Sequence, residues 1–158
     1  MNATVTRDPL EQYRRLFAAL EKLEVNYILV GGLAVLLHGF ARFTEDVDLL
    51  IDPRPGNVER LKRALREALG GADVEEIGAS DFEDYAVIRY VAGESLVVDL
   101  IARIGKVADF STVDWEFVDL DGIKVRVATP EALLRLKEGS LRPKDQQDVL
   151  FLRRLLGK

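Results

Sequence analysis

The chain has 158 residues and a net charge of −5, with no cysteine and a single histidine, His38. This composition excludes thiolate zinc sites, iron–sulfur clusters, disulfide frameworks and multi-histidine metal centres. Chemistry in this chain must therefore use carboxylates, lysine, arginine, hydroxyls and backbone amides. If a metal takes part, oxygen ligands favour Mg²⁺, Mn²⁺ or Ca²⁺.

The charge is unevenly distributed along the chain. Residues 126–158 contain 8 basic and 4 acidic side chains, whereas residues 1–125 contain 14 basic and 23 acidic ones. The basic segment can meet a polyanion, or its lysines and arginines can simply complement helix ends. No stretch is apolar over the roughly 18–20 residues that span a membrane, and no signal peptide pattern is visible. We therefore expect a cytoplasmic protein without membrane contact.

The first half of the chain alternates predicted helices and strands. Apolar residues at helical spacing, and short apolar runs bounded by glycine or proline, define these elements. In chain order they are a helix at residues 8–24, a strand at 27–30, a helix at 33–38, a strand at 47–51 and a helix at 58–69.

The second half is rich in predicted strands and ends in two helices. The strands are predicted at residues 74–77, 85–91, 96–101, 117–120 and 123–127, and the helices at 129–138 and 144–156. Hairpin turns are predicted at residues 92–95 and at Asp121-Gly122. This order predicts one α+β domain over residues 1–158. Its mixed β-sheet core covers about residues 25–127 with helices packed on one side, and a helical segment covers about residues 128–158.

A glycine pair, Gly31-Gly32, lies between a predicted strand and a predicted helix. Because glycine has no side chain, the backbone can approach a ligand closely there and adopt a positive φ. The following helix N-terminus would offer N–H groups to a phosphate. The alternative is a plain tight turn.

Three carboxylates occur on otherwise apolar strands. Asp46 and Asp48 are two residues apart, so both side chains lie on one face of a strand. Asp99 is the one acid among five apolar residues at positions 96–101. Like charges in apolar surroundings are costly unless a cation lies between them, although an exposed strand end would also tolerate Asp46 and Asp48. If the two strands are neighbours, the three acids can hold a pair of Mg²⁺ ions.

These residues resemble the minimal nucleotidyltransferase superfamily, which includes DNA polymerase beta and kanamycin nucleotidyltransferase. The shared pattern is the glycine pair, the Asp-x-Asp motif and a later single aspartate. The segment Arg42-x-Thr44-x-Asp46-x-Asp48 is similar in particular to the AbiE-type toxin nucleotidyltransferases of bacterial toxin–antitoxin systems. The C-terminal pattern, with Lys137 and then Arg142-x-Lys144-Asp145-x-x-Asp148, is similar to the same group.

The resemblance implies a metal-dependent transfer of a nucleotide from a nucleoside triphosphate to an acceptor hydroxyl on RNA, tRNA or a protein. In the resembled family the acids hold Mg²⁺ or Mn²⁺, which implies that Asp46, Asp48 and Asp99 are catalytic residues and metal ligands. The nucleotide-binding residues implied are Gly31, Gly32, Arg42, Thr44, Lys137 and Lys144. It also implies a place in a toxin–antitoxin pair, with a partner protein.

Two other classes of function remain open from the residues alone. One is a catalytically silent module that binds a nucleotide or a partner on the same fold, and the other is a phosphodiesterase that uses water as acceptor. Lys137 can equally lie at the edge of the core, but we expect Lys137 or Lys144 in the cleft of the acids. We expect a structural role for His38, and the second Asp-x-Asp, Asp119 and Asp121, is explained by the hairpin turn.

Overall fold

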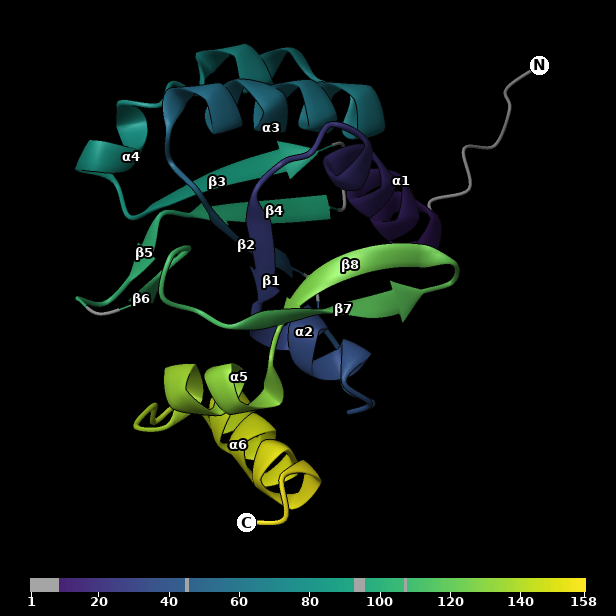
Figure 1. Cartoon of the computed structure of the whole chain (residues 1–158), viewed down its shortest axis with the longest axis vertical. Coiled ribbons are helices and arrows are strands. Elements are labelled where there is room, and N and C mark those ends of the chain that lie inside the picture. The colour runs from purple at the N-terminus through teal and green to yellow at the C-terminus, as the bar shows by residue number, and fades with distance from the viewer. Residues whose placement is uncertain (1–8, 45, 93–95, 107) are drawn as a thin grey trace.

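The computed structural model describes residues 9–44, 46–92, 96–106 and 108–158 (Figure 1). Its strands pair both parallel and antiparallel, and they come from both halves of the chain. The helices are α1 (Pro9–Lys22), α2 (Gly31–Leu37), α3 (Pro55–Leu69), η1 (Ala72–Glu76), α4 (Asp81–Asp84), α5 (Pro130–Lys137) and α6 (Pro143–Leu155). The strands are β1 (Tyr27–Val30), β2 (Asp46–Ile51), β3 (Val87–Ala92), β4 (Leu96–Ile101), β5 (Arg103–Ile104), β6 (Ala108–Asp109), β7 (Trp115–Leu120) and β8 (Ile123–Ala128).

Six strands form one mixed sheet in the order β3-β4-β2-β1-β8-β7. β2 lies inside this sheet, antiparallel to β1 and parallel to β4. β3 and β4 form one antiparallel pair at an edge, and β7 and β8 form another. The predicted α+β fold with a mixed sheet is therefore confirmed, and the chain places its Asp-x-Asp strand beside the strand of Asp99.

One apolar core joins the sheet to the long helices. α1 and α3 pack against each other, and α1 also contacts β8. Their inward faces carry fully buried residues such as Phe17 on α1 and Leu61 on α3. β1, β2 and β4 contribute apolar residues to the same core, and Tyr27–Val30 are buried along their whole length. Among the described residues, no helix is long and apolar enough to cross a membrane.

The C-terminal helices lie at the end of the molecule opposite to α3 (Figure 1). α5 and α6 pack against each other, and both contact α2. Phe40, which follows α2, stacks on Phe151 of α6 with 4.9 Å between the ring centroids. This packing brings the C-terminal lysines to the side of the sheet where β1 ends and α2 begins.

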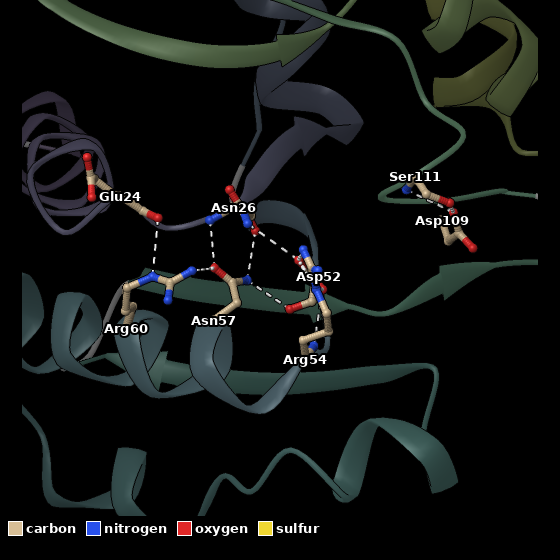
Figure 2. Close-up of polar contacts among 8 residues, drawn as sticks. All are labelled: Glu24, Asn26, Asp52, Arg54, Asn57, Arg60, Asp109 and Ser111. Carbon is tan, nitrogen blue, oxygen red and sulfur yellow. Dashed lines mark hydrogen bonds and ion pairs between the residues drawn. The ribbon is translucent and has the colours of Figure 1, made fainter.

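A polar network fixes the junction between β2 and α3 (Figure 2). Asp52, just after β2, accepts hydrogen bonds from the backbone N–H and the guanidinium of Arg54. Asn57 on α3 donates to the carbonyls of Asn26 and Asp52, at 3.0 and 2.8 Å. Its Oδ1 accepts from the N–H of Asn26 at 2.7 Å. The end of β2, the start of α3 and the entry to β1 are thereby tied together.

The structure corrects one predicted element and adds α4, β5 and β6, which were not predicted. Residues 74–77 were expected to form a strand, but the 3-10 helix η1 covers Ala72–Glu76. Val74 and Ile77 are buried three residues apart, which is the spacing of a helical turn and not of a strand. The short strands β5 and β6 form a separate two-stranded ribbon that apolar periodicity did not indicate.

Both predicted hairpins pair as expected. In the β7–β8 turn the N–H of Gly122 donates to Asp119 Oδ2 at 3.2 Å, so the second Asp-x-Asp belongs to the turn. The centre of the β3–β4 turn, residues 93–95, and the first residue of the helix predicted at 8–24 lie outside the described residues. α2 begins at Gly31, two residues earlier than predicted, so the glycine pair forms its first turn.

Candidate active site

Two neighbouring strands bring the predicted carboxylates together. Parallel pairing of β2 with β4 places Asp48 directly opposite Asp99. Asp46 lies two residues before Asp48, on the same face of β2. Burial raises the pKa of Asp48 to about 7, and the Asp99 and Asp46 carboxylates contribute to the rise. This cluster therefore favours either a shared proton or a bound cation near neutral pH.

Arg89 contacts this cluster from the edge strand β3. Antiparallel pairing places Arg89 opposite Asp99. Its Nε donates to Asp99 Oδ1 at 2.9 Å and its Nη2 donates to Oδ2 at 3.2 Å. The same Nη2 lies 3.7 Å from Asp46 Oδ2. Both oxygens of Asp99 are thus held by one guanidinium.

The glycine pair lies against the carboxylates. Gly31 has a φ of +75°, and a Cβ on it would lie 2.1 Å from Asp48 Oδ2. A Cβ on Gly32 would lie 3.0 Å from Thr44 Oγ1 and 3.1 Å from Arg42 Nη1. A side chain at position 31 is therefore excluded by Asp48, and the space beside Gly32 is bordered by a hydroxyl and a guanidinium.

The C-terminal helices contribute a second group of charges. Asp148 on α6 is fully buried and accepts from Arg42, which lies between α2 and β2. Lys137 at the end of α5 is 3.0 Å from Asp148 Oδ2 and 3.1 Å from Asp145 Oδ1. Ser140 Oγ donates to the other oxygen of Asp145 at 2.7 Å. Burial opposes ionisation of Asp145, but the Ser140 hydrogen bond and Lys137 lower its pKa.

A cleft of about 570 Å³ connects these two groups. Its lining includes the carboxylates Asp46 and Asp48 and also the apolar residues Leu133 and Leu136. All but one of the predicted site residues line it, namely Gly31, Gly32, Arg42, Thr44, Asp46, Asp48, Lys137 and Lys144. Asp99 lies beside Asp48, 9% exposed. The two predicted lysines therefore border the cleft that holds the acids.

His38 has the structural role that we expected. Its Nε2 lies 2.8 Å from the carbonyl oxygen of Ala128, which connects α2 to the end of β8. Its side chain is 7% exposed.

The donor set of the acids suits a divalent cation that binds together with substrate. Asp46 and Asp48 offer hard oxygen ligands to the cleft, and a cation would offset the burial and the carboxylate repulsion that raise the pKa of Asp48. Among the described residues, no group of three or more His, Cys, Asp or Glu side chains is already arranged as a metal cluster. Mg²⁺ commonly takes one or two carboxylates and completes its coordination with water and phosphate oxygens. The residues therefore fit the ion.

Sequence reasoning missed two contacts of this site. Arg89 was not identified, although the predicted β3–β4 hairpin places it about opposite Asp99 once residues are counted from the turn. The pairing of Arg42 with Asp148 joins positions 106 residues apart, and no local pattern reports such a contact.

The fold and the arrangement of the acids define the chain as a protein of nucleotidyltransferase fold. The profile of the family described as "Nucleotidyl transferase AbiEii toxin, Type IV TA system" matches residues 14–149. The chain therefore belongs to the AbiEii nucleotidyl transferase toxin family, which confirms the resemblance seen in the motifs. This membership assigns it to the nucleotidyltransferases of toxin–antitoxin systems.

Solved structures share this fold at low sequence identity. An antigenic nucleotidyltransferase-like protein from Paracoccidioides brasiliensis has a TM-score of 0.58 and 22% identity, over 97% of this chain and 79% of that chain. ANT(2″)-Ia, in complex with adenylyl-2″-tobramycin, has a TM-score of 0.63 and 16% identity, over 94% and 90% of the two chains. The lincosamide antibiotic adenylyltransferase LnuA has a TM-score of 0.59 and 16% identity, over 90% and 95%. A search of curated proteins gave no match.

Proposed function

We propose that this chain transfers a nucleotidyl group from a nucleoside triphosphate to an acceptor hydroxyl, on RNA such as tRNA or on a protein, with Mg²⁺ or Mn²⁺ as cofactor. The observation that carries the proposal is the placement of Asp46 and Asp48 in one cleft with the glycine pair and the C-terminal lysines. Family membership in the AbiEii nucleotidyl transferase toxins supports the same reaction class.

The triphosphate binds where the glycine pair leaves room in the cleft. A Cβ on Gly32 would meet the side chains of Arg42 and Thr44, so we place the phosphates in the space beside Gly32 that these two side chains border. Arg42 and Lys137 are both held by Asp148, which fixes the direction of their charges. Lys144 is exposed at the same cleft and adds a further positive charge.

The reaction proceeds by in-line attack on the α-phosphorus. Asp46 and Asp48 hold the metal, with Asp99 beside them, and a divalent cation bound there supplies Lewis-acid activation of the phosphate and of the acceptor hydroxyl. Asp99 accepts the proton of that hydroxyl. The acceptor oxygen bonds to the α-phosphorus while the bond to the pyrophosphate oxygen breaks. Lys137 and Lys144 stabilise the charge that develops on the leaving pyrophosphate.

The biological setting follows from the family. We propose that the chain works in the cytoplasm as one member of a toxin–antitoxin pair, with the second member as its partner protein. The nucleoside triphosphate and the acceptor are its substrates.

The reaction is tested by following label from an α-³²P-labelled nucleoside triphosphate, using each of the four bases with Mg²⁺. Total tRNA and cell protein serve as acceptors. We expect label on one acceptor class, and a loss of roughly 100-fold or more in Asp48→Asn, because a metal-binding and acid–base cluster is broken. Asp119→Asn is the matched control, since Asp119 belongs to the exposed second Asp-x-Asp.

Three results would contradict the proposal. Label released only as free mononucleotide would indicate a phosphodiesterase. Bound triphosphate without turnover would indicate a silent nucleotide-binding module. Equal transfer by wild type and Asp48→Asn would remove the acids from the reaction.

Metal binding has its own readout. We expect Mn²⁺ to raise the melting temperature of the wild-type chain, because the ion relieves repulsion between Asp48, Asp99 and Asp46. Asp48→Asn should abolish this rise and Asp119→Asn should retain it. An unchanged response in Asp48→Asn would place the metal elsewhere.

A further inference from the structure

We propose that Arg89 is a positioning residue for the transfer reaction. It holds the carboxylate of Asp99 in the orientation from which Asp99 accepts the proton of the acceptor hydroxyl. The inference rests on the proposed function, because that function gives Asp99 its role.

The geometry is that of a two-pronged guanidinium–carboxylate pair. Nε and Nη2 of Arg89 each donate to a different oxygen of Asp99, at 2.9 and 3.2 Å. Two such hydrogen bonds fix the plane of the carboxylate as well as its position, which a single ionic contact does not do. The backbone beneath them is equally fixed, because Arg89 and Asp99 are register partners of β3 and β4.

Asp99 needs such a hold because its other neighbours repel it. Asp48 lies directly opposite on β2, and its pKa is raised partly by the charge of Asp99. Asp46 lies on the same strand as Asp48 and is 3.7 Å from Arg89. Arg89 places a positive charge on the β3 side of this cluster and holds the Asp99 carboxylate beside the other two acids.

Arg89 has no packing role that would explain its presence. Its side chain is 61% exposed on an edge strand, whereas the Asp99 side chain is 12% exposed. The arginine end of this pair is exposed but Asp99 is buried, so replacing Arg89 should lower the melting temperature modestly without unfolding the chain. The positioning role is therefore read from kcat, with thermal melting as the check that each variant is folded.

The test compares Arg89→Lys and Arg89→Gln with wild type in the labelled transfer assay, with Mn²⁺ affinity measured separately by calorimetry without nucleotide. Lysine retains the positive charge but cannot make the two parallel hydrogen bonds that a guanidinium makes to a carboxylate. Arg89→Lys therefore separates the effect of carboxylate orientation from the effect of charge. We expect kcat to fall roughly 10- to 100-fold in both variants, because a misdirected proton acceptor slows the chemical step. The KM for the triphosphate should stay within about twofold, because Arg89 contacts none of the residues assigned to phosphate binding.

Loss of Arg89 should not weaken Mn²⁺ binding. Arg89 adds positive charge beside Asp46 and Asp99, so its removal in Arg89→Gln should leave Mn²⁺ affinity unchanged or tighter. Val91→Thr is the matched control, because Val91 lies two residues along β3 and is also exposed. It should match wild type in kcat, KM and Mn²⁺ affinity.

The measurements distinguish failure of this inference from failure of the proposed function. If wild type transfers label and Arg89→Lys keeps its kcat within about twofold, the inference is overturned and the proposed function stands. Weakening of Mn²⁺ binding by tenfold or more in Arg89→Gln overturns it too, since Arg89 would then shape the metal ligands. A wild-type chain that transfers no label overturns the proposed function and this inference with it.

Discussion

The carboxylate of Asp48 occupies the space that a side chain at position 31 would need. A Cβ on Gly31 would lie 2.1 Å from Oδ2 and 3.1 Å from Cβ of Asp48, so rotation of the carboxylate alone cannot make room. The positive φ of Gly31 adds a cost of about 1–2 kcal/mol for any residue with a side chain. Glycine at position 31 is thus required by its neighbour as much as by its own backbone.

Gly32 differs from Gly31, since its backbone needs no positive φ and its neighbours are Thr44 and Arg42. We expect Gly32→Val to retain the fold and to lose triphosphate binding by tenfold or more, because valine fills the space between these side chains and the phosphates. Calorimetry with a triphosphate measures the loss, and thermal melting checks the fold. Gly56→Ala on α3 is the control. Wild-type affinity in Gly32→Val would refute this placement of the phosphates.

At the residue scale, the chemistry was more predictable than the contacts. Asp46, Asp48 and Asp99 stand out in the sequence because charge is costly on apolar strands, and the parallel register of β2 and β4 places Asp48 beside Asp99. Their roles in catalysis and metal binding stay predictions. Arg89 carries no such signal, because an arginine on a half-exposed edge strand is ordinary.

At the scale of elements, the junction between β2 and α3 holds the strand that carries Asp46 and Asp48 in place. Asp52, Asn57 and Asn26 connect three segments there, and all three side chains are drawn in Figure 2. Arg54 lowers the pKa of Asp52 through its hydrogen bonds, against the opposing effect of burial. The strand that carries Asp46 and Asp48 is therefore anchored at its far end by a charged pair.

This anchor predicts a pH dependence of stability. The pKa of Asp52 is lower in the folded than in the unfolded chain, so its stabilisation is complete above about pH 4 and is lost as the pH falls further. We expect Asp52→Asn to cost about 1 kcal/mol at pH 7, because the charged hydrogen bonds to Arg54 are lost. The difference from wild type should shrink as the pH falls below about 4. Urea unfolding at each pH measures it, and a constant difference would contradict the ion-pair explanation.

Long apolar elements were predicted well, and short ones were not. The runs that became β1, β2 and β4 are buried nearly throughout, so hydrophobicity reports them directly. Among residues 73–77 only Val74 and Ile77 are buried, and this spacing of three is that of a helical turn, so a short segment with few apolar residues was wrongly predicted as a strand. β5 and β6 have two residues each, too short for periodicity to indicate them.

At the scale of the whole molecule, Asp148 joins the C-terminal helices to the rest of the chain. It is fully buried and binds Arg42 from the segment before β2 and Lys137 from α5. Both cations are themselves largely buried. Removal of Asp148 would therefore leave two largely buried positive charges without this carboxylate partner.

We expect Asp148→Ala to lower the free energy of unfolding by about 3 kcal/mol or more, since breaking a buried ion pair from one side costs this much. Chemical denaturation measures the change. Gln147→Ala, at the adjacent exposed position on α6, should change stability by less than about 0.5 kcal/mol. A loss below about 1 kcal/mol in Asp148→Ala would show that the helices are held by apolar packing alone.

Because the chain is synthesised from its N-terminus, the contacts of Asp148 form late in co-translational folding. Arg42 leaves the ribosome long before α6 is synthesised, because its partner Asp148 lies 106 residues later in the chain. Until then, neither Arg42 nor Lys137 has the Asp148 carboxylate as a partner. A nascent chain, or one truncated before α6, therefore lacks a complete site, so a toxin-family protein of this design acquires its full set of charges only once α6 has been made.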